Sequence, residues 1–298
     1  MIQTVIDFYV QRHEGVLKQL LQQSNIPAPL IREATEYCLF PGGKRIRPVL
    51  TYLAGALCDV PLPVIDVIAV AIELTHCYSL IHDDLPAMDN DDFRRGKPSC
   101  HKQFDEATAI LTGDGMQVLA IELLLKHLTP LLNAKALIQV TQELLKASGT
   151  QGMISGQSFD LSELSKKQVN EERLQYIHEL KTGRLISACF TMVLAAQSNL
   201  AFALQNQLLT YAHHLGLVFQ IQDDYLDHYA SLHYLGKNRA SDASNAKSTY
   251  ASLFCKDELE EKINTHYNHA LDCLHAFGDK AHDLITLTIK LRQRSQSQ

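Results

Sequence analysis

Several features that would point to other classes of protein are scarce or missing in this sequence. Its seven cysteines are scattered without a Cys-x-x-Cys pair, which fits reduced thiols in a cytosolic protein and offers no zinc site. The net charge is -6 and no basic run is present, which argues against a nucleic-acid partner. Alternating, strand-like patterns are nearly absent, so we expect an all-α fold.

Signals for secretion or membrane insertion are also missing. Residues 1–7 show no basic start followed by an apolar run, so no signal peptide is expected. The longest apolar stretch, residues 60–81, is interrupted by Asp66, Glu73 and His76, which argues against a membrane span. Hydrophobic residues make up 46% of the chain and charged residues 20%, as in soluble globular proteins. We therefore expect a cytoplasmic protein without stable membrane association.

Helical periodicity fills most of the chain. All nine prolines lie at or before Pro130, so none interrupts the later helical patterns. No linker, low-complexity tract or charge block marks a boundary, and we expect a single domain over residues 1–298. Asn170, followed by two glutamates, is predicted to cap a helix. Helices are expected at roughly 1–23, 30–40, 48–58, 63–85, 103–127, 134–159, 171–197, 200–226 and 256–292.

An acidic segment follows the most apolar of these predicted helices. Carboxylates at such density repel one another unless cations lie among them, and hard oxygen ligands suit magnesium or calcium. The alternative is a solvated acidic loop, the more usual fate of a charge run. Pro86 breaks the helical pattern, so we expect the helix to end or bulge at residues 85–88 and to bring Asp89 back toward Asp83. The segment holds five aspartates and then two arginines: Asp83, Asp84, Asp89, Asp91, Asp92, Arg94 and Arg95.

A second acidic segment, about 140 residues later, favours a metal site over a solvated loop. There too an apolar run ends in a pair of aspartates, Asp223 and Asp224, and Asp227 follows. Residues four apart on a helix lie about 40° out of line and roughly 6 Å apart along the axis. Asp223 and Asp227 therefore share a face, with Gln220 one turn earlier. Such carboxylates can hold hydrated magnesium that takes further ligands from substrate phosphates.

Basic side chains that could meet such a ligand occur in several segments. Lys44 and Arg47 lie three apart at a predicted helix start, where both can reach one anion together with helix N–H groups. Taken singly, these segments have simpler explanations: a basic surface turn, a structural histidine, charge balance, loop lysines, or a kinked helix at Gly183. Taken together, they fit a ligand with several phosphates bridged by metals. The set is Lys44, Arg47, His76, Arg94, Arg95, Lys181, Lys237 and Lys247.

These motifs, in this order, resemble those of the trans-isoprenyl diphosphate synthases, and most closely the bacterial-type farnesyl diphosphate synthases (geranyltranstransferases). The resemblance covers nearly the whole chain. One departure lies beside Lys247, where Ala246 stands in place of the usual glycine, which matters only if that position needs a positive φ. The matching motifs are Gly-Gly-Lys-Arg-x-Arg-Pro at 42–48, Ser-Leu-Ile-His-Asp-Asp-Leu-Pro-Ala-Met-Asp at 79–89, Arg-Arg-Gly at 94–96, Gly-Gln at 156–157, Lys-Thr-Gly at 181–183, Phe-Gln-Ile-Gln-Asp-Asp at 219–224 and Gly-Lys at 236–237.

The resemblance implies an isoprenoid synthase fold, a helical bundle around a central cavity, and a homodimer. It implies condensation of isopentenyl diphosphate with dimethylallyl or geranyl diphosphate to give farnesyl diphosphate, with three magnesium ions (Mg2+) per active site. The implied metal ligands are Asp83, Asp84, Asp89, Asp223, Asp224 and Asp227. The allylic diphosphate would meet Arg94, Lys181, Lys237 and Lys247, with Thr182 and Gln220 at its reacting end. Isopentenyl diphosphate would be bound by Lys44, Arg47, His76 and Arg95. Candidate catalytic residues are Arg94, Lys181, Thr182, Gln220 and Lys237.

Product length depends on the floor of that cavity. Tyr78 lies roughly 7–8 Å below Asp83 along a helix axis, beside the small Ser79, and is predicted to close the floor. The alternative is an ordinary core aromatic. In the family, an aromatic residue five positions before the first aspartate goes with C15 products. The rival functions are a geranylgeranyl diphosphate synthase, a terpene cyclase and a non-catalytic regulatory subunit.

Overall fold

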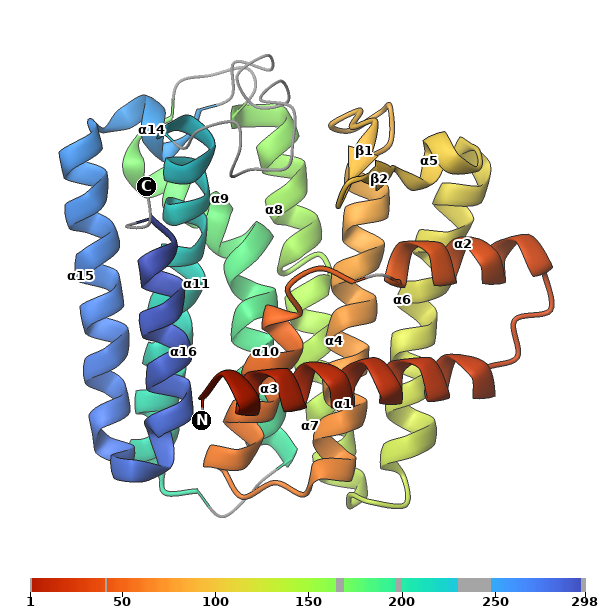
Figure 1. Cartoon of the computed structure of the whole chain (residues 1–298), viewed down its shortest axis with the longest axis horizontal. Helices are drawn as coiled ribbons and strands as arrows, with labels where there is room; N and C mark the ends of the chain where they lie inside the picture. The colour runs from red at the N-terminus through yellow and green to blue at the C-terminus, as the bar shows by residue number, and fades with distance from the viewer. Residues whose placement is uncertain (1, 41, 165–168, 197–199, 230–247, 296–298) are drawn as a thin grey trace.

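The computed structural model describes residues 2–40, 42–164, 169–196, 200–229 and 248–295 of the chain. These residues are almost entirely helical, which confirms the predicted all-α fold. One small exception is an antiparallel hairpin of two-residue strands, β1 (Phe93–Arg94) and β2 (Lys97–Pro98). The hairpin lies just beyond the end of α4 (Figure 1), so it extends from the first acidic segment.

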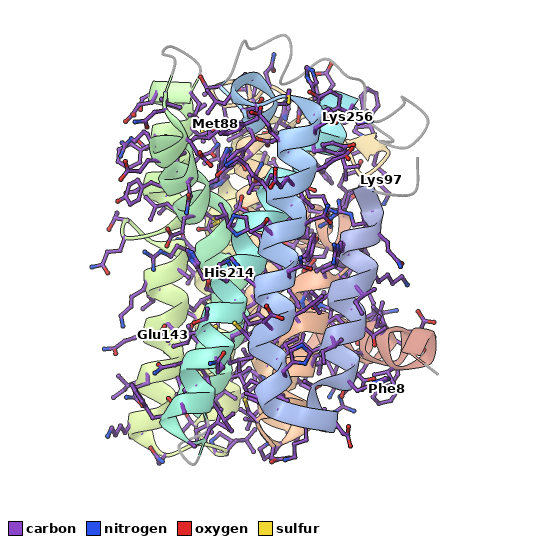
Figure 2. All side chains as sticks on the ribbon, turned by 90° about the vertical axis from the view of Figure 1, so that its left-hand side faces the viewer. Phe8, Met88, Lys97, Glu143, His214 and Lys256 are labelled. Atoms are coloured by element: carbon purple, nitrogen blue, oxygen red, sulfur yellow. The ribbon has the colours of Figure 1, made fainter. Side chains whose placement is uncertain are left out.

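The remaining elements form a bundle in which most long helices run alongside one another, while α1 and α2 lie across it (Figure 1). Figure 2 shows α15 and α16 covering one side of this bundle, with His214 of α11 beside them. The helices are α1 (Ile2–Gln23), α2 (Pro29–Leu39), α3 (Ile46–Leu57), α4 (Leu62–Asp83), α5 (Cys100–Gln103), α6 (Glu106–Leu128), α7 (Ala134–Ser148), α8 (Met153–Phe159), α9 (Glu171–His178), α10 (Arg184–Ala196), α11 (Phe202–Tyr229), α14 (Tyr250–Leu253), α15 (Lys256–Leu274) and α16 (His282–Arg292). Two π-helical segments, η1 (Asp160–Leu164) and η2 (Glu179–Gly183), and two 3-10 segments, η3 (His275–Ala281) and η4 (Gln293–Ser295), join or extend them.

Helix α4 forms the centre of the core. It packs against α3, α6 and α10, and it is apolar on nearly every face because it is enclosed on nearly every side. By length and composition alone, α4 and α6 could each cross a membrane, although interior helices of soluble proteins pass the same test. In α4, 83% of the most apolar window is buried inside the protein, so packing in the core accounts for its composition.

One polar contact in this core fixes α1 across the bundle. Asp66 of α4 accepts hydrogen bonds from Arg12 at 2.7 and 2.6 Å and from the Tyr52 hydroxyl at 2.8 Å. A buried carboxylate is tolerated where both oxygens have partners, as they do here. The contact ties α1, α3 and α4 together at a distance from the acidic segments.

Three of the predicted helices are interrupted in the structure. The helix expected at 134–159 stops at Ser148, because Gly149 adopts an extended conformation, and it resumes as α8 at Met153. The helix expected at 171–197 widens into η2, and the one expected at 256–292 bends at Gly278, where φ is 57°. The predicted cap is confirmed, since the Asn170 side chain accepts the Arg173 N–H at 2.9 Å.

Candidate active site

A cavity of about 1070 Å³ opens where α4 and α11 carry their acidic segments. Its walls come from α3, α4, α8, η2, α10, α11 and the β1–β2 hairpin. Lys237 and Lys247 lie outside the described residues. The predicted site residues that line the cavity are Lys44, Arg47, His76, Tyr78, Ser79, Asp83, Arg94, Arg95, Lys181, Thr182, Gln220 and Asp223.

The first acidic segment brings one carboxylate to the cavity through a sharp turn. Helix α4 ends at Asp83, and the Asp89 N–H donates to the Asp83 carbonyl at 2.9 Å, which confirms that the chain turns back around Pro86. Burial raises the pKa of the Asp83 carboxyl to about 6; Asp89 adds to this effect and Lys181 opposes it. Because burial disfavours the charged form of this carboxylate, a cation bound beside it would stabilise that form.

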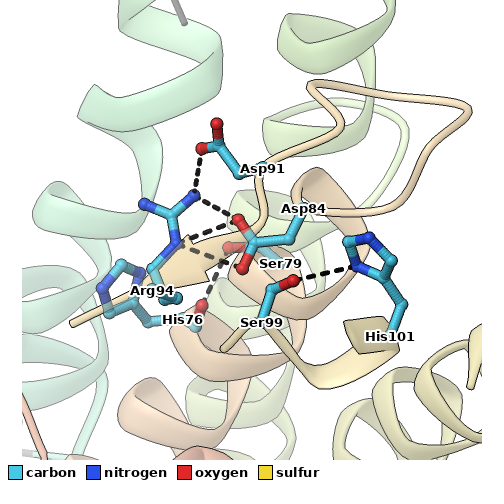
Figure 3. A network of polar contacts seen from close by, with 7 residues as sticks. All are labelled: His76, Ser79, Asp84, Asp91, Arg94, Ser99 and His101. Atoms are coloured by element: carbon cyan, nitrogen blue, oxygen red, sulfur yellow. Dashed lines mark hydrogen bonds and ion pairs between the residues drawn. The ribbon is translucent and has the colours of Figure 1, made fainter. Parts of the chain in front are cut away.

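Asp84 has a different environment from Asp83. Its side chain is buried and accepts hydrogen bonds from Arg94 Nε at 2.9 and 3.2 Å, as well as from Nη2. The same guanidinium donates to Asp91 at 3.1 Å (Figure 3). Asp84 does not line the cavity. Its position fits an anchor for the hairpin that presents Arg94, because both of its oxygens already accept protein donors.

In the second acidic segment, as in the first, one aspartate lines the cavity and its neighbour is buried. Asp223 lines the cavity and accepts Arg294 Nη2 at 3.0 Å, whereas Asp227 is exposed. Asp224 is buried and accepts the Gln220 amide and the Tyr250 N–H, each at 2.9 Å. Asp83 and Asp223 thus face the cavity from helices far apart in sequence.

The aspartates that face the cavity suit magnesium. Among the described residues, no three His, Cys, Asp or Glu side chains are gathered at metal-binding distances. Magnesium usually keeps several waters and takes one or two carboxylates together with substrate phosphates, so a closed protein cage is not needed. Asp83 and Asp223, the two aspartates that line the cavity, fit that kind of site.

Lys181 and Thr182 are presented by the π-helical segment η2. Lys181 Nζ donates to Asp160 at 2.8 Å, and the Thr182 hydroxyl donates to Gln220 Oε1 at 2.9 Å. Gly156 of α8 lies against the backbone of η2, where an added Cβ would overlap the Lys181 N and Cα atoms. The Gly-Gln motif at 156–157 therefore serves close packing of α8 under Lys181.

A second group of donors lines the cavity from the loop before α3, from α3 and α4, and from the hairpin. Arg47 Nη1 lies 3.4 Å from His76 Nε2, and the buried Arg47 Nε has no partner among the described residues. Burial lowers the pKa of His76 well below its usual 6.5, and the nearby Arg47 lowers it further. Burial also lowers the pKa of Lys44, as does nearby Arg294. This concentration of donors suits a polyanion.

Tyr78 and Ser79 line the cavity from α4, five and four residues before Asp83. Tyr78 is 5% exposed there, and its buried hydroxyl has no partner among the described residues. Its ring packs edge-on against His82, with centroids 6.0 Å apart. The His82 ring fits over Gly113 of α6, where an added Cβ would collide with it. Tyr78 is therefore at the level at which a floor is expected.

Four residues of the site were missed from the sequence. Arg294 was missed because it meets Asp223 from 71 positions away, and Asp160 because it meets Lys181 from 21 positions away. Arg45 of the basic motif turns inward to Glu73, 28 positions later. No local pattern signals these pairs, because each depends on the packing of distant helices.

The chain is similar in sequence and in structure to known proteins. The family described as Polyprenyl synthetase matches residues 28–280. The chain is 43% identical over 245 residues to the farnesyl diphosphate synthase of Haemophilus influenzae, covering 82% of each. The structure matches the crystal structure of a geranyltransferase from Legionella pneumophila with a TM-score of 0.92 and 60% identity, covering 99% of this chain and 98% of that one. It also matches a Helicobacter pylori geranyltransferase complexed with magnesium and isoprenyl diphosphate, with a TM-score of 0.80 and 29% identity, covering 98% and 97%.

Proposed function

Because the chain belongs to the polyprenyl synthetase family, we propose that it is a farnesyl diphosphate synthase. The family predicted from its motifs is thereby confirmed. The reaction condenses isopentenyl diphosphate with dimethylallyl or geranyl diphosphate. The observation that carries this proposal is a single cavity lined by two aspartates and several cations. We divide this polar lining into two walls: Asp83, Asp223 and Lys181 form the first, and Lys44 and Arg47 the second.

The first wall is assigned to the allylic diphosphate and its magnesium ions. Asp83 and Asp223 would hold the metal, with Asp89 and Asp227 beside them. Bound magnesium supplies positive charge to the leaving diphosphate. Lys181 and Arg94 add fixed positive charge to that wall, which lowers the free energy of the developing anion. The Helicobacter pylori geranyltransferase is described as complexed with magnesium and isoprenyl diphosphate, which supports this assignment.

The second wall is assigned to isopentenyl diphosphate, through Lys44, Arg47, His76 and Arg95. Two separate anion sites hold two substrates in one orientation, so that the allylic carbon meets a double bond rather than water. Thr182 and Gln220 hydrogen-bond to each other, and we assign them to the reacting end of the allylic substrate. A terpene cyclase binds one diphosphate and has no use for the second wall.

Assembly and location are part of the same proposal. Four apolar side chains of α6 are at least 44% exposed: Ile110, Leu111, Val118 and Leu125. A row of this kind on one helix favours a protein partner, and we assign it to a second copy of the chain. We also assign the protein to the cytoplasm, as a soluble enzyme.

Incorporation of radiolabelled isopentenyl diphosphate into an acid-labile product tests the activity. The proposal predicts incorporation that requires both an allylic diphosphate and magnesium and that stops when EDTA is added. A terpene cyclase would consume an allylic diphosphate without incorporating the label. A non-catalytic subunit would show no turnover, and either result would overturn the proposal.

A further inference from the structure

Two arginines beside the cavity share an unusual backbone conformation. Arg45 has a φ of 49° and Arg95 a φ of 54°. Both lie in the left-handed region, which residues other than glycine and asparagine seldom adopt. They lie in different segments: Arg45 in the loop 42–47, defined here to include the first two residues of α3, and Arg95 in the β1–β2 hairpin. Such conformations persist only where surrounding contacts hold them, and they gather at functional sites.

The contact that these arginines share is Glu73 of α4. Arg45 Nη1 donates to Glu73 Oε1, and Arg95 Nη2 lies 3.9 Å from the same oxygen. The Glu73 side chain is 2% exposed, so its charge is not screened by solvent. Arg45 is fixed further by Glu14, at 2.6 Å, and by the Leu39 carbonyl, at 2.6 Å. One buried carboxylate therefore joins both phosphate-binding segments.

The loop 42–47 also packs directly against the hairpin, at Gly43 and Arg95. A Cβ added to Gly43 would lie 2.9 Å from Arg95 Nε and 3.2 Å from its Cζ. The loop crosses the Arg95 guanidinium closely because residue 43 has no side chain, and an added methyl group would shift that guanidinium. Lys44 follows at once, so the position of Arg95 and that of Lys44 depend on each other.

We propose that Glu73 is a positioning residue for the second diphosphate. It holds the loop 42–47 and the hairpin in fixed relation, so that Lys44, Arg47 and Arg95 present converging donors to isopentenyl diphosphate. This inference rests on the proposed function. Glu73 and Arg45 border the cavity but are only 2% and 3% exposed. In this role Glu73 acts through its two arginines, and of these Arg95 is the one assigned to the substrate.

Glu73→Gln tests the role, because glutamine keeps the shape of the side chain and removes its charge. We expect the KM for isopentenyl diphosphate to rise about tenfold, while the KM for geranyl diphosphate and kcat change less than twofold. Asp66→Asn is the matched control: it removes a buried, arginine-paired carboxylate from the same helix, outside the cavity lining. It should lower Tm and leave both KM values unchanged. Equal effects of the two variants on the KM for isopentenyl diphosphate would overturn the proposal.

Gly43→Ala provides a second test that leaves Glu73 intact. The added methyl group must displace Arg95, so the KM for isopentenyl diphosphate should again rise selectively. In an Arg95→Gln background, Gly43→Ala should raise the KM for isopentenyl diphosphate by a further factor of less than two. If Gly43→Ala and Arg95→Gln raise this KM independently, so that their factors multiply in the double variant, Gly43 does not act through Arg95 and the coupling between loop and hairpin is contradicted. Wild-type enzyme without any turnover of isopentenyl diphosphate would instead contradict the proposed function itself.

Discussion

Tyr78 links the geometry of one side chain to the length of the product. Its ring stands below Asp83 with a buried hydroxyl that has no partner among the described residues, so the ring's bulk is what it contributes there. Tyr78→Ala should open the floor and shift the main product from C15 to C20 or longer, as read by chromatography of the dephosphorylated alcohols. Tyr78→Phe is the control and should retain C15. A Tyr78→Ala enzyme that still stops at C15 would mean that other residues form the floor.

His13 shows how burial of a titratable ring links stability to pH. It is fully buried, and burial, with a smaller effect of Arg45, lowers its pKa to about 3 from the usual 6.5. The folded state keeps the ring neutral while the unfolded state takes up a proton below pH 6.5. Stability is therefore fully present above pH 6.5 and is lost as the pH falls toward 3.

Between pH 7 and pH 5 this one group should lower the free energy of unfolding by about 2 kcal/mol. Urea unfolding of His13→Leu should show a correspondingly smaller loss over that interval. His275→Leu, at a histidine that is 74% exposed, is the control and should keep the wild-type pH dependence. An unchanged pH dependence in His13→Leu would show that its proton uptake does not differ between the folded and unfolded states.

The sequence predicted the cavity-lining residues that a local pattern marks. Asp83 and Asp89 were linked through the break at Pro86, and Lys44 with Arg47 through their spacing on a helix start. The sequence could not show that Asp83 lines the cavity while Asp84 is buried against Arg94, because the two residues are neighbours with the same chemistry. Arg94 and the end of α4 together decide which of them is enclosed, and that depends on how the hairpin folds back.

At the scale of elements, α8 and η2 depend on a glycine contact. An alanine methyl at Gly156 would overlap the η2 backbone at Lys181, and backbone cannot move aside as a flexible side chain can. Gly156→Ala should therefore destabilise the protein by about 1–3 kcal/mol and raise the KM for the allylic diphosphate, since Lys181 is displaced. Differential scanning calorimetry and steady-state kinetics measure the two effects.

Gly115→Ala is the matched control for that substitution. Gly115 lies within α6 and has no atom within 4 Å of an added Cβ. Alanine there should stabilise the helix by up to about 1 kcal/mol and leave the kinetics unchanged. If Gly156→Ala behaved like Gly115→Ala, the close approach of α8 to η2 would not matter for the site.

The long helices were predictable because they have long apolar patterns, whereas their interruptions and the four-residue helices α5 and α14 were not. A π-helical turn at 179–183 leaves the periodicity of its neighbours intact, so the sequence 171–197 reads as one helix. The interruption after Ser148 depends on Gly149, and that at Gly278 on a single positive φ, yet isolated glycines also occur inside helices, as Gly115 does.

At the scale of the whole molecule, the apolar row on α6 predicts self-association. Sedimentation at micromolar concentration should give a species of twice the chain mass of 33.4 kDa. Val118→Lys, at a residue that is 64% exposed, should shift it toward the monomer by placing a charge in the interface. Phe202→Lys, at an exposed residue of α11, is the control and should remain dimeric. A wild-type monomer would reject the dimer.

The identity of the product tests the central claim most directly. Purified protein would be incubated with isopentenyl diphosphate, dimethylallyl diphosphate and magnesium, and the dephosphorylated products separated by chromatography against C10, C15 and C20 standards. A farnesyl diphosphate synthase gives farnesol as the main alcohol, and none when EDTA is present. Geranylgeraniol as the main alcohol, or an undiminished yield in EDTA, would contradict the account.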